Sequence, residues 1–454
     1  MADAGALPGQ TKMNVIREPL AEKLFKPGIG EEMWSFANGL YPYCRSITGN
    51  GVRQTLNDVK KVIDLTIHEV PSGTPVFDWN VPREWNIRDA WIKDPSGKKI
   101  VDFKVHNLHV LNYSTPINGK FELAELKKHI FTMPDQPDLI PYRTSYYHEN
   151  WGFCMTHEQM LSLEDGVYEA YIDSDHDPNG SLTYGEYFIQ GESDETILFS
   201  AHCCHPSLAN DNCSGVSVNT HLARALASMK GKTRYSYVFI FAPGTIGSLT
   251  WLSRNGDRIK NIHQGLILSC VGDAGGPTYK RSQKGDALID KAVEKVMRDN
   301  SKEPNIVDFW PYGYDERQYN SPAFRLNVGL MLRSRFGLFP EYHTSADNMD
   351  FIRPEYLEES YKTALEVIDI IENDYKMVNL SPNGEPNLGK RGLYGAVGGD
   401  KKEYDANLPM LWMLNQSDGT KSILDIALRA KLPFPRFHRI AKILEEYDLL
   451  EYRK

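Results

Sequence analysis

The sequence has no apolar run long enough to cross a membrane, since no stretch approaches the roughly 18 apolar residues that a spanning helix needs. Segment 1–13 also lacks a basic start followed by an apolar run, so we expect no secretory signal. Acidic residues outnumber basic ones, 60 against 51, and the formal net charge is −9. We therefore expect a cytoplasmic protein with no membrane partner and no general affinity for nucleic acid.

Cysteine is scarce as well. Six residues in 454 are too few for a disulfide-stapled scaffold, and none of them has the spacing of a Cys-x-x-Cys zinc knuckle. Cys203 and Cys204 stand side by side in a histidine-rich segment. We expect both thiols to be reduced and to pack as small buried residues, with metal binding as the alternative.

The length of 454 residues predicts two or three domains, because one hydrophobic core does not grow to this size. Apolar runs typical of buried strands alternate with helical patterns, as in 196–201, 214–229 and 235–242. This order indicates an α/β domain with a mainly parallel sheet and helices on both faces, which binds ligands at the carboxyl ends of its strands. We assign it to residues 1–75 and 165–385.

Two further segments differ in character from this α/β domain. Residues 76–164 contain short β-like runs, many aromatic residues and frequent Pro and Asn, which predicts an inserted, mostly-β domain. Segment 377–402 is rich in Asn, Pro, Gly and Lys and is typical of a linker. Three short helices and a final strand then predict a winged-helix-like domain at 400–454.

The charges of this last segment do not favour DNA binding. From residue 401 onward it holds ten basic and eight acidic residues, and Glu445 and Glu446 share a helix with Arg436, Arg439 and Lys442. We expect the domain to serve docking or to form a homo-oligomer, with DNA binding as the alternative.

The first motif that carries chemistry is segment 199–215. A buried strand ends at His202, and Asp211 follows nine positions later, just before a helix that opens at Ser214 and Gly215. A loop of this length can return the carboxylate to the imidazole, and a nitrogen and an oxygen ligand so placed suit Zn²⁺. The alternative is that Asp211 only caps the helix while His202 forms a hydrogen bond in the core.

The second motif, 341–350, lies between a strand and a long helix expected at 354–375. If the strands are parallel, His343 stands in a loop at the same sheet edge and is the expected third ligand. His205 is a further candidate, either as a ligand or as a residue that supports the ligands. Its alternative is a capping or packing role beside Pro206.

The order of strand, His202, short loop, Asp211-Asn-Cys-Ser-Gly215 and helix resembles the zinc-dependent exopeptidases, which include bacterial aminopeptidases and glutaminyl cyclases. In that family the matching histidine and aspartate bind metal, and the aspartate bridges two zinc ions in di-zinc members. The Tyr342-His-Thr-x-x-Asp347 segment is similar to the one that carries the family's last ligand. The resemblance therefore implies metal binding by His202, Asp211 and His343.

Nearly the whole chain resembles a bacterial aminopeptidase-like family, in which such a core carries an inserted β domain and a C-terminal winged helix. The resemblance lies in Arg45-Ser-Ile-Thr-Gly-Asn-Gly-Val-Arg53, in Asp78-Trp79 with Glu84-Trp85, and in segments 141–147, 205–212, 243–248, 315–318 and 342–344.

The sequence departs from the zinc aminopeptidases at two places. That family has two glutamates after the second strand, one a general base and the other a ligand, whereas segment 243–248 reads Pro-Gly-Thr-Ile-Gly-Ser. Ser269 stands where the next strand should carry an acidic ligand, and Asp273 substitutes only if its loop bends back. We therefore expect one zinc ion rather than two, with three protein ligands and an open position for hydrolysis.

Without the glutamate pair, segment 315–318 is the best remaining source of a carboxylate near the metal. We expect Glu316 to accept the proton, and Asp315 to orient His343 or the backbone. The alternative is an exposed charged loop.

Arg143, Tyr146 and Tyr147 of the inserted domain are candidates for substrate binding, with a structural aromatic cluster as the alternative. Together these residues predict a zinc-dependent, aminopeptidase-like hydrolase that cleaves an amide bond of a small peptide or peptide-like conjugate. The alternatives are a zinc-dependent acyl-transfer or cyclisation enzyme of a biosynthetic pathway, and a non-catalytic former peptidase that binds a ligand.

Overall fold

The computed structural model describes residues 15–301, 303–393 and 401–452, with the backbone alone at 401–406. Segment 1–13 and part of the expected linker, 394–400, lie outside the described residues. The chain forms two compact units. The larger comprises Leu24–Asp290 and Glu303–Ala364, and the smaller comprises Met1–Lys23, Lys291–Lys302 and Leu365–Lys454.

The larger unit is built on an eight-stranded sheet of order β1-β10-β12-β11-β13-β16-β14-β15. Its four central strands are parallel: β12 (Ser236–Ala242), β11 (Thr196–His202), β13 (Ile262–Leu268) and β16 (Val328–Leu332). The strands nearer the edges are β1 (Thr66–Pro71), β10 (Ser181–Ile189), β14 (Thr278–Lys280) and β15 (Asn305–Val307). Every residue of β11, β12 and β16 is buried, as in parallel strands covered on both faces.

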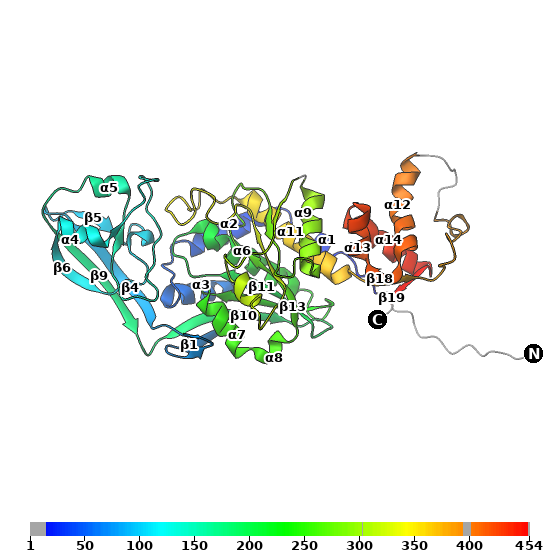
Figure 1. Ribbon diagram of the computed structural model, residues 1–454, viewed down its shortest axis with the longest axis horizontal. Helices are drawn as coiled ribbons and strands as arrows, with labels where there is room; N and C mark the ends of the chain where they lie inside the picture. The colour runs from blue at the N-terminus through cyan, green and yellow to red at the C-terminus, as the bar shows by residue number, and fades with distance from the viewer. Residues whose placement is uncertain (1–14, 302, 394–400, 453–454) are drawn as a thin grey trace, which may run out of the picture. The chain divides into compact units, whose positions relative to one another are not determined.

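Helices cover both faces of this sheet (Figure 1). On one face α6 (Gly215–Ala227) packs on the strands and is covered in turn by α2 (Ile29–Leu40) and α3 (Asn50–Val62). This double contact explains why α6 is buried almost all round. On the other face α7 (Ile246–Arg254) packs against β10 and against α10 (Glu316–Tyr319). The expected mainly parallel α/β architecture is confirmed.

In the described part of the chain before residue 376, four more α-helices lie outside the insertion, and two of them are long. They are α1 (Leu20–Leu24), α8 (Gly256–Ile259), α9 (Leu288–Asn300) and α11 (Pro354–Asn373). Proline at the first position of α11 costs no hydrogen bond, because the amide there has no partner within the helix. Among the described helices, none combines the length and apolarity that crossing a bilayer requires.

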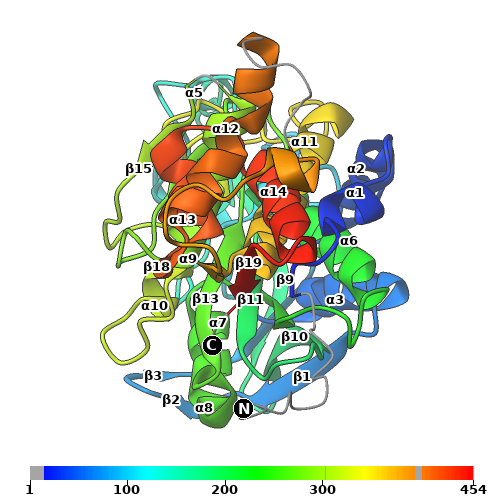
Figure 2. The ribbon, with the colours of Figure 1, turned by 90° about the vertical axis from the view of Figure 1, so that its right-hand side faces the viewer.

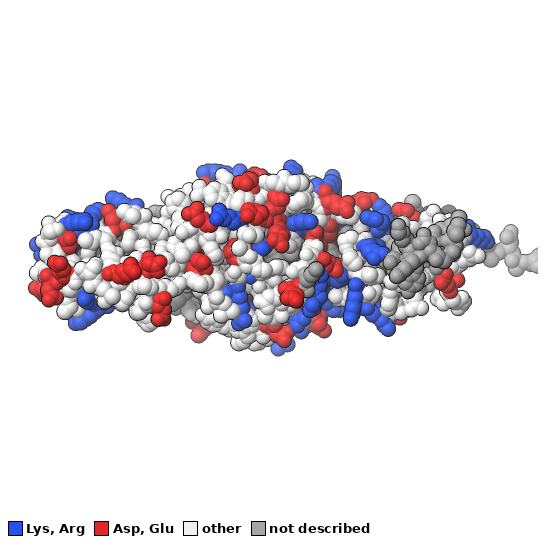
Figure 3. Space-filling view, turned by 90° about the horizontal axis from the view of Figure 1, so that it is seen from above, with Lys and Arg blue, Asp and Glu red and all other residues white. Residues whose placement is uncertain are grey.

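The inserted domain is a four-stranded antiparallel sheet of order β5-β4-β9-β6 with its own core. Its strands are β4 (Glu84–Lys93), β5 (Lys99–Asp102), β6 (Ile117–Glu122) and β9 (Val167–Asp177). Shorter elements are β2 (Pro75–Val76), β3 (Trp79–Asn80), β7 (Ile130–Phe131), β8 (Phe153–Cys154), α4 (Leu123–Leu126) and α5 (His157–Leu161). Because β9 pairs with β4 up to Asp177, the insertion ends later than the predicted residue 164. On the face drawn in Figure 3, acidic and basic side chains are interspersed over this sheet.

The C-terminal helices α12 (Lys401–Gln416), α13 (Ile423–Ala430) and α14 (Phe434–Glu446) pack together (Figure 2). They accompany a sheet of order β18-β17-β19, formed by Asp418–Ser422, Lys376–Asn379 and Leu450–Tyr452. Strand β17 lies where we predicted a linker, so the winged-helix-like fold begins near Lys376 rather than at 400. The backbone bonds of β17 to β19 determine this boundary, which composition alone did not reveal.

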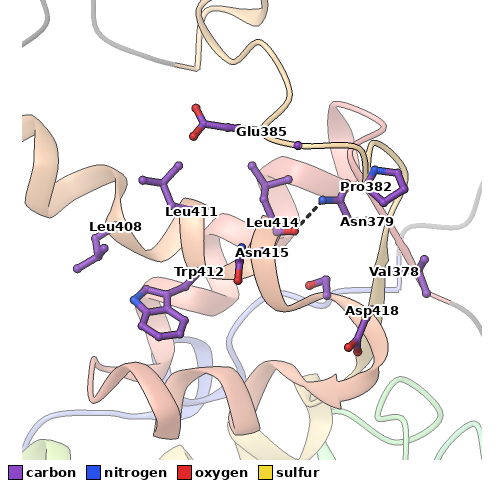
Figure 4. Close-up of a pocket in the computed structure, with 12 residues that line it drawn as sticks. Val378, Asn379, Pro382, Glu385, Leu408, Leu411, Trp412, Leu414, Asn415 and Asp418 are labelled. Atoms are coloured by element: carbon purple, nitrogen blue, oxygen red, sulfur yellow. Dashed lines mark hydrogen bonds between the residues drawn. The ribbon is translucent and has the colours of Figure 1, made fainter.

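This unit contains an open cavity of about 930 Å³ between α12 and the segment after β17. Figure 4 shows Leu411, Leu414 and Glu385 around it, with the Asn379 side-chain Nδ2 donating to the Leu414 carbonyl at 2.7 Å. On α14, Lys442 forms an ion pair with Glu18. The expectations of an oligomer and of no nucleic-acid partner remain predictions.

Candidate active site

Three side chains from separate segments meet at the carboxyl edge of the central strands. His202 is the last residue of β11, Asp211 lies in the irregular turn 209–214 before α6, where its own backbone angles are not helical, and His343 lies in the loop that precedes α11. The His202 Nε2 atom is 2.8 Å from Asp211 Oδ1, and the His343 Nε2 atom is 3.0 Å from Asp211 Oδ2. The structure thus brings together the three residues that the two sequence motifs singled out.

A third imidazole, His205, lies beside this group. Its Nε2 atom is 3.9 Å from Asp211 Oδ2, and the ligand atoms of His202, His205 and Asp211 all lie within 4.8 Å of one another. Although burial opposes ionisation, the nearby imidazoles hold the pKa of Asp211 well below its usual value. Burial lowers the pKa of His205 well below its usual value, which favours the neutral imidazole. Nitrogen donors around a carboxylate are the set that Zn²⁺ prefers.

Asp347 and Arg45, which we did not predict to be site residues, form hydrogen bonds with the backbone near Asp211. The buried Asp347 carboxylate accepts from the amides of Asn210 at 2.6 Å and Asp211 at 3.0 Å. Burial raises the pKa of Asp347 to about 8. The buried Arg45 donates to the His205 carbonyl at 2.8 Å. The available signals were the position of Asp347 in the same motif as His343 and that of Arg45 at the start of the segment 45–53 that carries the family resemblance.

The four residues His202, His205, Asp211 and His343 form what we call the histidine cluster. Asp273 does not belong to it. Its Oδ1 atom accepts from the Gly275 amide and the Ser334 hydroxyl, and its Oδ2 atom accepts from the Asn210 side chain at 2.7 Å. These hydrogen bonds therefore fix the Asp273 carboxylate against Asn210 and Ser334 and keep it out of the histidine cluster. The expectation that Asp273 substitutes for the acidic ligand missing at Ser269 is not supported by this geometry.

Glu316 and Asp315 have different surroundings, although they are adjacent. Glu316 Oε1 lies 2.7 Å from Lys280 Nζ, and both side chains are 0% exposed. Asp315 Oδ1 instead accepts from the Thr245 amide at 2.7 Å and the Ser248 hydroxyl at 3.0 Å. The structure thus gives Glu316 a structural ion pair instead of the expected place beside the metal, and it joins Asp315 to segment 243–248 rather than to His343.

A cavity of about 340 Å³ opens onto the histidine cluster, and Asp315 is part of its wall. Tyr314 stacks on His202 with ring centroids 4.7 Å apart, and Tyr342 stacks on His343 at 3.9 Å. Both tyrosines also line the cavity. Burial raises the pKa of Asp315. The buried Asp315 carboxylate and the rings of Tyr314 and Tyr342, which stack on two of the imidazoles, therefore border the same cavity.

The inserted domain reaches the site through segment 141–147. The Tyr142 amide donates to the His343 carbonyl at 2.8 Å, and the Tyr142 hydroxyl is hydrogen-bonded to that of Tyr146. Tyr146 and Tyr147 line the cavity, and their role in substrate binding remains a prediction. Arg143 is exposed and donates to the Tyr142 carbonyl at 3.0 Å, and it does not belong to the cavity wall.

The cysteine pair is buried beside the cluster. The Cys204 sulfur accepts from the Gly244 amide at 3.2 Å and lies 3.3 Å from His205 Nδ1. Burial raises the pKa of the Cys204 thiol to about 12, so it stays protonated at neutral pH. This state agrees with the expected packing role rather than with metal binding.

Comparisons with known proteins agree with this architecture. The protein provisionally named a polysaccharide biosynthesis protein with an aminopeptidase-like domain, from Clostridium acetobutylicum, is 51% identical over 93% of this chain and 96% of its own length. A crystal structure from the same organism, provisionally described as a peptidase, is 49% identical, covers 96% of this chain and 97% of its own, and has a TM-score of 0.88. A zinc aminopeptidase from Bacillus subtilis shares the fold at 11% identity, with 75% and 94% coverage and a TM-score of 0.55.

Family models account for almost the whole chain. Residues 375–452 match a winged helix-turn-helix. This match includes β17, which pairs with β19 at the end of the same domain. Residues 34–374, which hold the sheet, the insertion and the histidine cluster, match the domain of unknown function DUF4910. The chain is therefore a member of the DUF4910 family, with an aminopeptidase-like core and a C-terminal winged helix.

Proposed function

We propose that the protein is a zinc-dependent, aminopeptidase-like hydrolase that cleaves an amide bond of a small peptide or peptide-like conjugate. The observation that carries the proposal is the convergence of His202 and His343 on the buried Asp211 carboxylate, beside a cavity that His202 and His205 line. These three residues would hold one ion, and His205 would support or complete the set. A bound zinc ion would polarise the scissile carbonyl and lower the pKa of water to about 7.

In this proposal the proton acceptor is Asp315. Hydrogen bonds from Thr245 and Ser248 tie its carboxylate to segment 243–248, where the resemblance to zinc aminopeptidases led us to look for a glutamate pair. Burial raises its pKa, which makes it a stronger base than an exposed aspartate. Asp315 thus supplies a carboxylate at the place where the usual one is missing.

A second candidate is acyl transfer or cyclisation at the same site. It is favoured by the absence of the glutamate pair from segment 243–248 and by the name of the Clostridium acetobutylicum relative, which points to a biosynthetic pathway. The two candidates differ in the acceptor of the acyl group, which is water in hydrolysis and an amine in transfer. Product analysis in the presence of an added amine therefore separates them.

Metal removal tests the proposed function directly. We expect the purified protein to contain about one zinc per chain, to hydrolyse members of a panel of aminoacyl amides, and to lose this activity after dialysis against a chelator. One equivalent of Zn²⁺ should restore it, because the cluster supplies only one set of ligands. Activity that survives complete zinc removal, or a purified protein without stoichiometric metal, would contradict the proposal.

The Asp315→Asn variant tests the proposed base. We expect kcat to fall by about 10²–10⁴-fold, the usual contribution of a general base, while the zinc content stays at the wild-type level. Asp308→Asn is the matched control, because Asp308 is 85% exposed. An Asp315→Asn variant that keeps both its zinc and its kcat would assign the proton transfer to another group.

A further inference from the structure

A second cavity adjoins the one that contains the histidine cluster. Its volume is about 500 Å³, within the range of about 300–1,000 Å³ typical of small-molecule sites. Trp79, Tyr146 and Tyr147 line both cavities. A ligand whose amide lies at the cluster would therefore meet these rings before entering the second cavity.

Two of the shared rings are exposed. Trp79 is 39% exposed and Tyr147 is 49% exposed, and their ring centroids lie 5.3 Å apart. Trp79 belongs to the hairpin of β2 and β3, whereas Tyr147 follows the segment that contacts His343. Large aromatic faces left in water at the mouth of a cavity mark a binding surface, because covering them releases water.

The polar groups around the rings show what kind of ligand they suit. Asp78 and Asn80 flank Trp79 in the hairpin, and both line the second cavity. The one Lys or Arg among its lining residues, Arg83, is paired with Glu149 at 2.5 Å. The cavity thus offers aromatic faces and hydrogen-bonding groups but no unpaired cation for a phosphate or carboxylate among those lining residues.

We infer that the second cavity is a subsite for a neutral saccharide. A sugar ring presents apolar C–H groups on its faces and hydroxyls around its edge. One face of the sugar packs across the neighbouring rings of Trp79 and Tyr147, while the hydroxyls donate to Asp78 and Asn80. The assignment of the two cavities to parts of the substrate rests on the proposed function. The amide is cleaved at the histidine cluster, and the saccharide part of the conjugate lies in the second cavity, past Trp79. The substrate class is then a saccharide that carries an amide-linked group.

Saturation-transfer NMR on the full-length protein tests this subsite. The probes are N,N′-diacetylchitobiose, cellobiose, maltose and lactose, with trileucine as the peptide probe, all added to protein stripped of metal by a chelator. We expect at least one disaccharide to bind. Trp79→Ala and Tyr147→Ala should each weaken this binding about tenfold, by loss of a stacked face. Tyr447→Ala is the matched control, since Tyr447 is 47% exposed and lies in the other unit.

The outcomes separate this inference from the proposed function. Failure of all four disaccharides to bind would overturn the subsite, as would saccharide binding that Trp79→Ala leaves unchanged in a variant with wild-type circular dichroism. Trileucine binding that replaces saccharide binding and depends on Trp79 would overturn it in favour of a peptide groove. Because saccharide binding is measured without metal, an absence of amidase activity in the separate assay of the zinc-loaded protein would contradict the hydrolase and leave the subsite in place.

Discussion

The Asp211→Asn variant is expected to lose its bound zinc and, with it, hydrolytic activity. Asp211 is the carboxylate on which the Nε2 atoms of His202 and His343 converge, and it is fully buried. Removing a residue that only supports a ligand costs about 10–100-fold in metal affinity or activity. Loss of a ligand charge at the centre of the cluster should exceed that range, so we expect more than about 100-fold in both.

Asparagine keeps the shape of the side chain, so the fold should survive this substitution. The hydrogen bond that the Asp211 amide gives to Asp347 involves only the backbone of residue 211 and remains available. Metal analysis, circular dichroism and the amidase assay on the same preparation measure the three effects. Asp257→Asn is the control, because Asp257 is fully exposed. A folded Asp211→Asn variant that retains one zinc per chain would show that the metal is held elsewhere.

The α/β core was accessible from the sequence because its local patterns agree with its tertiary structure. The apolar run 196–201 became β11, and the helical pattern within 214–229 became α6. Parallel pairing then placed His202 at the sheet edge without any further information. The position of His343 at the same edge followed from the strand that precedes its loop.

The parts that the sequence did not reveal depend on contacts between distant segments. Strand β17 looked like a linker, because its partner β19 lies at the other end of the winged-helix unit. Asp273 looked available to a metal, because its bonds to Asn210 and Ser334 come from other loops. Composition and periodicity predict which segments form helices or strands and which residues are buried. They do not predict which donor forms a hydrogen bond with a given buried acceptor when the two lie in distant segments.

The ion pair between Glu316 and Lys280 is another contact that the sequence did not reveal. Its lysine gives a prediction for stability. Replacing Lys280 by Met should lower the free energy of unfolding by about 3–5 kcal/mol, because it leaves the Glu316 carboxylate buried without its counter-ion. Burial already raises the pKa of Glu316 in the intact protein, and loss of the ammonium group should raise it further. The folded variant would then hold a proton that the unfolded chain releases near pH 4.5. Its deficit relative to the wild type should therefore grow as the pH rises above that value.

The paired variant Lys280→Met/Glu316→Met distinguishes a structural carboxylate from a catalytic one. Two apolar side chains of similar size leave no buried charge, so most of the lost stability should return. If Glu316 serves only the ion pair, this variant should also recover a kcat close to that of the wild type, since Asp315 and the histidine cluster are untouched. Urea unfolding at pH 6 and pH 8, together with the amidase assay, measures both effects. A stable double variant that contains zinc but has lost its activity would return the role of base to Glu316.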